Sequence, residues 1–112
     1  MNLAAIRNRK RIEIIAKLRG AMREVGCEVF LVGSWARGDF DAFSDKDLLA
    51  IVDRQEDCDK VFDRLGLIGD DVLVFTRAEY QKRLAGGDTF VLSLDRDKVA
   101  LSTDDKAGEN LA

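Results

Sequence analysis

Hydrophobic residues in the first quarter of the chain recur with helical spacing. Charged residues fill the positions between them, as expected for a helix with one face packed on a core. The apolar stripe consists of Ile14, Leu18, Met22 and Val25. The pattern predicts an amphipathic helix over residues 4–25, and Gly26 stands where a left-handed carboxyl-terminal cap is expected.

Short and almost uninterrupted apolar runs predict three strands, and such runs are typical of a sheet covered on both faces. These strands span residues 27–32, 47–52 and 71–76. Helical spacing and capping residues predict helices over residues 57–65, 77–84 and 89–94, and a final short strand over residues 99–101. Thr76 and Glu79 match a capping box, and Asp88 can cap the last helix.

This order of elements predicts an α/β (α+β) domain with a small mixed β-sheet flanked by helices. We expect one domain over residues 1–101 and a flexible carboxyl-terminal tail over residues 102–112. Residues 33–38 are expected to form a loop or a short helical turn.

Composition narrows the function before any motif is considered. The chain has 112 residues and no histidine, which excludes Ser-His-Asp catalysis and histidine-ligated zinc within it. No apolar run approaches the roughly 20 residues that span a bilayer, and there is no signal-peptide pattern, so we expect a cytoplasmic protein. Cys27 and Cys58 are too few and too far apart for a disulfide framework and are expected to be reduced.

Charge is unevenly distributed. Residues 1–24 hold seven basic and two acidic residues, a net charge of +5 that leaves −8 for the remainder of a chain whose total is −3. The simpler interpretation is a solvated helix face, and the alternative is a surface that meets nucleic acid, a nucleotide or an acidic partner. We do not expect direct nucleic-acid binding.

The stretch from Leu31 to Asp53 contains the candidate chemistry. Asp45 and Asp47 stand at the start of a buried strand, and residues two apart in a strand point to the same face. Two neighbouring carboxylates repel each other unless a cation lies between them, and oxygen ligands with substrate phosphates favour Mg²⁺. Lys46 between them should face the other way.

Gly33 and Ser34 stand at the end of the preceding strand, where a glycine lets a ligand approach the backbone closely. Ser34 offers a hydroxyl, a helical turn here would present its amino end to a phosphate, and Arg37 could add positive charge. Two rival motifs fail. A P-loop would need Lys where Asp39 stands, and an EF-hand loop read from Asp39 would need Glu where Ala50 stands.

The whole stretch resembles the signature GSxARGxxxxxSDxDL of minimal nucleotidyltransferases in the DNA polymerase beta superfamily. The matching positions are Gly33, Ser34, Ala36, Arg37, Gly38, Ser44, Asp45, Asp47 and Leu48. The resemblance covers nearly the whole chain except the tail and implies a polymerase-beta-like fold. The family's third carboxylate opens the third strand, where Asp71 matches best and Asp70 is the alternative.

The resemblance implies transfer of AMP from ATP to an acceptor hydroxyl, with two Mg²⁺ ions held by Asp45, Asp47 and Asp71. Asp71 would also accept the proton of the acceptor, while Gly33, Ser34 and Arg37 would bind the phosphates.

The chain is nearly all catalytic module, so the acceptor is expected on a partner or on a second copy. Proteins of this size resemble the antitoxin half of HEPN/MNT toxin–antitoxin modules, in which AMPylation of a tyrosine silences the HEPN toxin. The alternatives are an antitoxin that acts by binding alone and a homodimeric small-molecule nucleotidyltransferase. Tyr80, the single tyrosine, is expected to pack on the core rather than to be a self-modification site.

Overall fold

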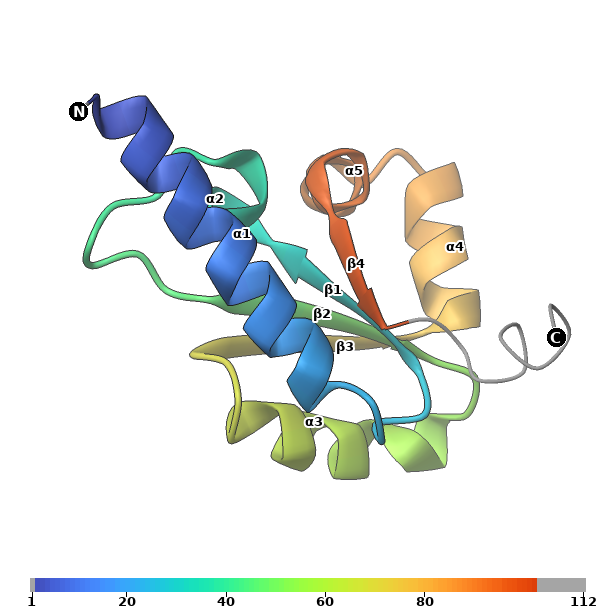
Figure 1. The fold of residues 1–112 in the computed structure, drawn as a ribbon. Helices are drawn as coiled ribbons and strands as arrows, with labels where there is room; N and C mark the ends of the chain where they lie inside the picture. Colours follow the sequence, from blue (N-terminus) through green and yellow to red (C-terminus); the bar gives the residue numbers. More distant parts are fainter. Residues whose placement is uncertain (1, 103–112) are drawn as a thin grey trace, which may run out of the picture.

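A four-stranded sheet with strand order β3-β2-β1-β4 forms the centre of the domain (Figure 1). The structure, a computed structural model, describes residues 2–102. Strand β1 runs antiparallel to both β2 and β4, and β2 runs parallel to β3. The strands are β1 (Glu28–Val32), β2 (Asp47–Val52), β3 (Asp71–Thr76) and β4 (Val99–Ser102). The predicted mixed sheet is therefore confirmed.

Helices cover both faces of this sheet (Figure 1). Antiparallel neighbours need only short connections, whereas the parallel pair β2–β3 needs a crossover, which is supplied by a helix. The helices are α1 (Leu3–Ala21), α2 (Gly33–Arg37), the crossover α3 (Cys58–Gly66) with a preceding 3₁₀ turn η1 (Gln55–Asp57), α4 (Arg77–Ala85) and α5 (Thr89–Asp97).

Alternate residues of the apolar strands feed two separate cores, as the near-continuous hydrophobic runs predict. On one face, Leu31 and Leu48 pack with residues of α1, α2 and α3. On the other face, Val32 and Leu49 pack with Tyr80 of α4 and with residues of α5. Because helices cover both faces of the sheet, the ends of the strands are where polar side chains can reach solvent.

Several element boundaries differ from the prediction. The first helix ends at Ala21, four residues before the predicted end, and the chain then turns so that the carboxyl-terminal part of the apolar stripe still reaches the core. Gly26 is left-handed, with φ of 75°, but it follows this turn instead of capping the helix directly. Helix α5 continues to Asp97, three residues beyond the predicted end.

Predicted caps are found at two helices. The Thr76 hydroxyl accepts a hydrogen bond from the amide of Glu79 at 3.2 Å, and Asp88 accepts from two amides of α5. The Glu79 carboxylate pairs with Arg83 of the same helix. Ser102, assigned to the tail by the sequence pattern, is the last residue of β4, and the rest of the predicted tail, residues 103–112, lies outside the described residues.

Two arginines of the basic helix α1 make contacts that the solvated-face interpretation does not include. Arg11 donates hydrogen bonds to backbone carbonyls of α2, and Arg19 donates to the carbonyl of Ala100 in β4. Over residues 2–102, no helix combines the length and the apolar character needed to cross a bilayer.

Candidate functional site

Strand register brings three distant segments together at one edge of the sheet. Val32, the last residue of β1, is paired with Asp47, the first residue of β2. Asp47 is in turn paired with Asp71, the first residue of β3. The end of β1 and the beginnings of β2 and β3 therefore meet, although Val32 and Asp71 are far apart in the chain.

Three carboxylates gather at this edge. One oxygen each from Asp45, Asp47 and Asp71 lies within 4.8 Å of the others. Asp47 and Asp71 point to the sheet face that α4 and α5 cover, because their neighbours Leu49 and Leu73 belong to that core. Lys46 points to the other face, where its ammonium lies 5.5 Å from the centroid of the Trp35 ring. An all-oxygen donor set of this size fits a hard divalent cation such as Mg²⁺.

The Asp47 carboxylate lies in an environment that disfavours its charged form. Burial first, and then the neighbouring carboxylates of Asp71 and Asp45, raise its pKa from 3.8 to about 6. Its Oδ1 is the buried side-chain oxygen or nitrogen that lacks a hydrogen-bond partner within residues 2–102. A buried carboxylate oxygen without a donor is costly in a native protein. A cation bound between the carboxylates would satisfy it, so the residues present fit a metal.

Gly33 lies directly against this carboxylate. Its φ is 75°, in the left-handed region that favours glycine, and a Cβ placed on it would lie 2.5 Å from Asp47 Oδ2. Glycine at this position therefore serves two purposes: it turns the chain out of β1 into α2, and it leaves room for the Asp47 side chain.

Asp70 and Asp71 occupy different positions relative to the carboxylate cluster. Asp71 is in register with Asp47 and contributes its carboxylate to the cluster. Asp70 Oδ2 instead accepts a hydrogen bond of 2.9 Å from the amide of Lys46, and its own amide donates to the carbonyl of Lys46 at 3.0 Å. Asp70 thus fastens the beginning of β3 to the beginning of β2, and Asp71 remains exposed at the cluster.

Helix α2 supplies the candidate phosphate-binding groups. It is a single turn of five residues, so its dipole is small, and the groups available to an anion are the backbone of Gly33, the hydroxyl of Ser34 and the guanidinium of Arg37. Arg37 pairs with Asp39 at 3.1 Å, but both side chains are about half exposed. Such surface pairs are weak, so Arg37 can exchange this partner for a phosphate.

A cavity of about 390 Å³ adjoins the carboxylates. Its reactive end is formed by Gly33, Arg37, Asp47 and Asp71, and its far wall is formed by Phe90, Ser93, Leu94 and Asp97 of α5. Sequence reasoning missed this wall because no motif marks it and nearly 20 residues separate it from Asp71. A larger cavity of about 680 Å³ lies at the opposite end of β2, beside Val52, away from the carboxylates.

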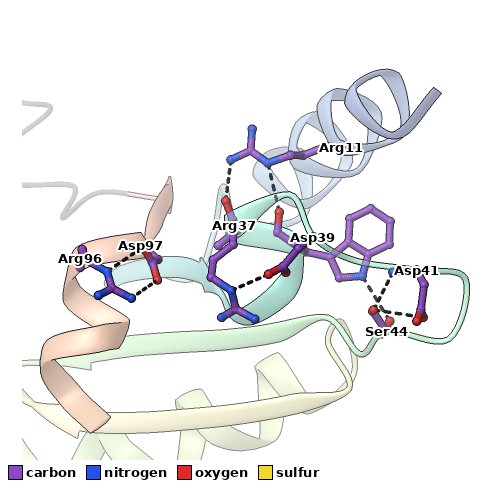
Figure 2. Close-up of polar contacts among 9 residues, drawn as sticks. Arg11, Arg37, Asp39, Asp41, Ser44, Arg96 and Asp97 are labelled. Atoms are coloured by element: carbon purple, nitrogen blue, oxygen red, sulfur yellow. Dashed lines mark hydrogen bonds and ion pairs between the residues drawn. The ribbon is translucent and has the colours of Figure 1, made fainter. Parts of the chain in front are cut away.

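The loop that leads to Asp45 is held in shape by its own polar groups (Figure 2). Asp41 accepts hydrogen bonds from the amide of Phe43 and the hydroxyl of Ser44, and the Trp35 indole donates to the carbonyl of Ser44 at 3.2 Å. The Trp35 ring also stacks on Phe40 with centroids 3.7 Å apart. This ordered loop displays Phe43, whose side chain is 94% exposed, two residues before Asp45.

Tyr80 lies in the core of the other face, as predicted. It is buried, and its hydroxyl donates a hydrogen bond of 2.9 Å to Asp95. Burial and the Asp95 carboxylate both raise the pKa of Tyr80 above its ordinary value. A hydroxyl in this position is not available as an acceptor for the cluster at the strand ends.

Comparison with known proteins identifies one domain type. Residues 12–111 match the family model described as a nucleotidyltransferase domain, which covers most of the chain. No curated protein and no solved structure matches the chain.

Proposed function

Because the chain belongs to the nucleotidyltransferase domain family, we propose that it moves AMP from ATP to a hydroxyl group on a partner protein. Nucleotidyl transfer is the general chemistry of the domain, and an acidic triad able to hold a metal is present. ATP as the donor and a protein tyrosine as the acceptor are our proposal. The observation that carries it is the strand register that joins Asp47 to Asp71 beside Gly33.

We place ATP in the cavity of about 390 Å³ beside the carboxylates, because its two ends have different linings. Gly33 and Arg37 line one end of the cavity and bind the β- and γ-phosphates together with Ser34 of the same helical turn, and the nucleoside occupies the space beside α5. Phe90 of α5 is 55% exposed, which leaves a ring available for stacking on a base. The α-phosphate then lies between α2 and the carboxylates.

Asp45, Asp47 and Asp71 would hold the divalent ions, which would neutralise phosphate charge and polarise the attacking oxygen. The acceptor oxygen forms a bond to the α-phosphorus, the bond from that phosphorus to the bridging oxygen breaks, and pyrophosphate leaves. Asp71 is exposed at the cluster and accepts the proton of the acceptor hydroxyl, then releases it to water. Positioning and fixed charge supply most of the rate enhancement.

We assign the acceptor to a partner because the reactive edge faces solvent. Asp45 and Asp71 are exposed, and the neighbouring Phe43 offers an apolar anchor on an ordered loop. The chain's own tyrosine, Tyr80, is buried on α4. We propose a tyrosine of a HEPN-type toxin as the acceptor, which makes this chain an antitoxin that acts in the cytoplasm.

Two other functions remain as alternatives. A protein that neutralises its partner by contact alone would not need the carboxylates. A nucleotidyltransferase acting on a small molecule would need them, but it would use a free hydroxyl compound as acceptor.

The test uses ATP labelled at the α-phosphate, Mg²⁺, and the HEPN-type ribonuclease. We expect label on a tyrosine of the ribonuclease and loss of its activity. The variant Asp45→Asn with Asp47→Asn should transfer no label, whereas the control Asp59→Asn with Asp63→Asn, which changes two exposed carboxylates on α3, should act like the wild type. Unchanged transfer by the first variant would contradict the metal assignment. Neutralisation by that variant without transfer would support the binding-only function.

A further inference from the structure

Helix α1 contacts the one-turn helix α2 through the shared apolar core, where Trp35 and Ala36 are buried, and through the polar side chain of Arg11. The guanidinium of Arg11 donates from Nε to the carbonyl oxygen of Trp35 at 3.1 Å and from Nη2 to the carbonyl oxygen of Ala36 at 2.8 Å (Figure 2). The carbonyl of Ser34, in the same turn, accepts from the amides of Gly38 and Asp39. The last carbonyls of a helix have no partner within the helix, and Arg11 supplies donors to two of those in α2.

The position of Arg11 suits this task in three ways. The last carbonyls of a helical turn lack partners within the turn, and a planar guanidinium can serve two of them at once. The contacts are part-buried, so water competes with them less than with an exposed pair. Gly38 ends α2 with φ of 88°, and a Cβ there would lie 4.0 Å from Arg11 Cδ, so the chain turns away beside the arginine stem.

Arg11 differs in this respect from the other cations of α1. Arg9 is exposed on the same helix and has no hydrogen bond or ion pair within the described part of the chain. Arg19 contacts β4 rather than α2. Arg11 alone among them is bonded to the element that carries Gly33, Ser34 and Arg37.

The two halves of the site depend on Arg11 to different degrees. The carboxylates of Asp47 and Asp71 stand on β2 and β3, where backbone pairing holds them. The phosphate-binding groups stand on a single turn, and helices this short are not stable without outside contacts. Losing Arg11 would therefore loosen α2, which would keep only its core packing, and would leave Asp47 and Asp71 in place on their strands.

We propose that Arg11 is a positioning residue for the polyphosphate of the nucleotide, acting through the carbonyls of α2. This inference rests on the proposed function, since it takes a nucleoside triphosphate as the ligand of α2. Arg11 itself lies behind α2 and would not touch the substrate. Replacing Arg11 is therefore expected to weaken nucleotide binding without weakening metal binding, and this difference can be measured.

The experiment compares Arg11→Ala, Arg11→Lys and the control Arg9→Ala with the wild type. Trp35, the single tryptophan, lies in α2 and serves as the fluorescent reporter of nucleotide binding. Dissociation constants are measured for MgATP by this fluorescence and by calorimetry, and for Mn²⁺ alone by electron paramagnetic resonance. Circular dichroism establishes that each variant is folded.

We expect Arg11→Ala to bind MgATP about tenfold more weakly than the wild type, with Mn²⁺ affinity unchanged and with altered Trp35 emission. Arg11→Lys, which can serve one carbonyl, should recover part of the loss, and Arg9→Ala should match the wild type. Equal MgATP affinity of Arg11→Ala and wild type would overturn the inference. So would a parallel loss of Mn²⁺ affinity or of the fold, because Arg11 would then be a general structural residue. If the wild type itself binds no MgATP, the proposed function fails instead.

Discussion

Asp47 shows how a single residue can be placed for function at the cost of stability. Its carboxylate is half-buried, it adjoins two like charges, and its Oδ1 has no hydrogen-bond partner in the described chain. Each of these features favours the protonated form. A divalent cation would neutralise the like charges, pair with Oδ1 and offset the cost of burying the charge, so the same arrangement that destabilises the free protein favours the metal-bound one.

The raised pKa of Asp47, about 6, predicts a pH dependence. Protons compete with metal at this carboxylate, so the apparent affinity for Mn²⁺ should fall about tenfold for each pH unit below the pKa. In the metal-free protein, the stability that Asp47 contributes depends on pH in the opposite direction to the metal affinity. The stability that Asp47 contributes is present below its ordinary pKa of 3.8 and is lost as pH rises through about 6, because the folded state holds the proton more tightly.

Mn²⁺ titrations by electron paramagnetic resonance across this range, together with thermal unfolding with and without metal, measure both effects. Asp47→Asn should remove the pH dependence and raise the stability of the metal-free protein near neutral pH by about 1 kcal/mol. A metal affinity that stays constant through pH 6 would contradict the placement of Asp47 in the metal site.

Gly33 provides a second prediction at the scale of one residue. Alanine there would meet left-handed backbone and a Cβ position 2.5 Å from Asp47 Oδ2. Gly33→Ala should cost about 1–3 kcal/mol of unfolding free energy and displace the carboxylate, with loss of Mn²⁺ binding.

The chain offers a matched control at Gly20, in α1, where a Cβ would meet nothing within 4 Å. Gly20→Ala should stabilise the protein by about 0.5–1 kcal/mol and leave metal binding unchanged. Urea denaturation of both variants gives the comparison, and a neutral effect of Gly33→Ala would show that the close approach to Asp47 is not required.

The secondary-structure elements explain what could be predicted and what could not. The extended apolar runs predict the sheet. The strand β2 begins at Asp47, however, so Asp45 reaches the carboxylate cluster from the preceding loop and not through strand periodicity. The end of α1 was missed because apolar residues in the following turn continue the helical stripe. The α5 wall of the cavity was missed because it depends on how α5 packs beside β2 and β3, which no local pattern encodes.

At this scale we predict different roles for adjacent carboxylates. Asp70→Ala removes the bond to the Lys46 amide that joins the beginnings of β2 and β3, so it should lower stability by about 1 kcal/mol and retain metal binding. Asp71→Asn should keep the stability and weaken Mn²⁺ binding roughly tenfold or more. Thermal unfolding and Mn²⁺ titration of the two variants distinguish the structural role from the metal-binding role, and reversed outcomes would make Asp70 the third ligand.

At the scale of the whole molecule, the sequence divides into a basic first segment and an acidic remainder, and the structure shows what some of the basic residues contact. Residues 1–24 carry +5 and the rest carries −8, which suggested either a solvated face or a partner-binding face. The contacts of Arg11 and Arg19 show that two of these charges hold α1 against the body of the domain. Composition could not show this, because it depends on which side of a helix a carbonyl happens to approach.

The meeting of three strand ends also bears on how the protein is made. A nascent chain that has emerged only as far as Gly69 contains Gly33, Asp45 and Asp47 but not Asp71, which is the pairing partner of Asp47. The site is complete only once β3 has been synthesised and has crossed over to lie beside β2. Under the proposed function, a chain that lacks β3 lacks one of the three carboxylates, so we expect no nucleotide transfer until β3 has joined β2.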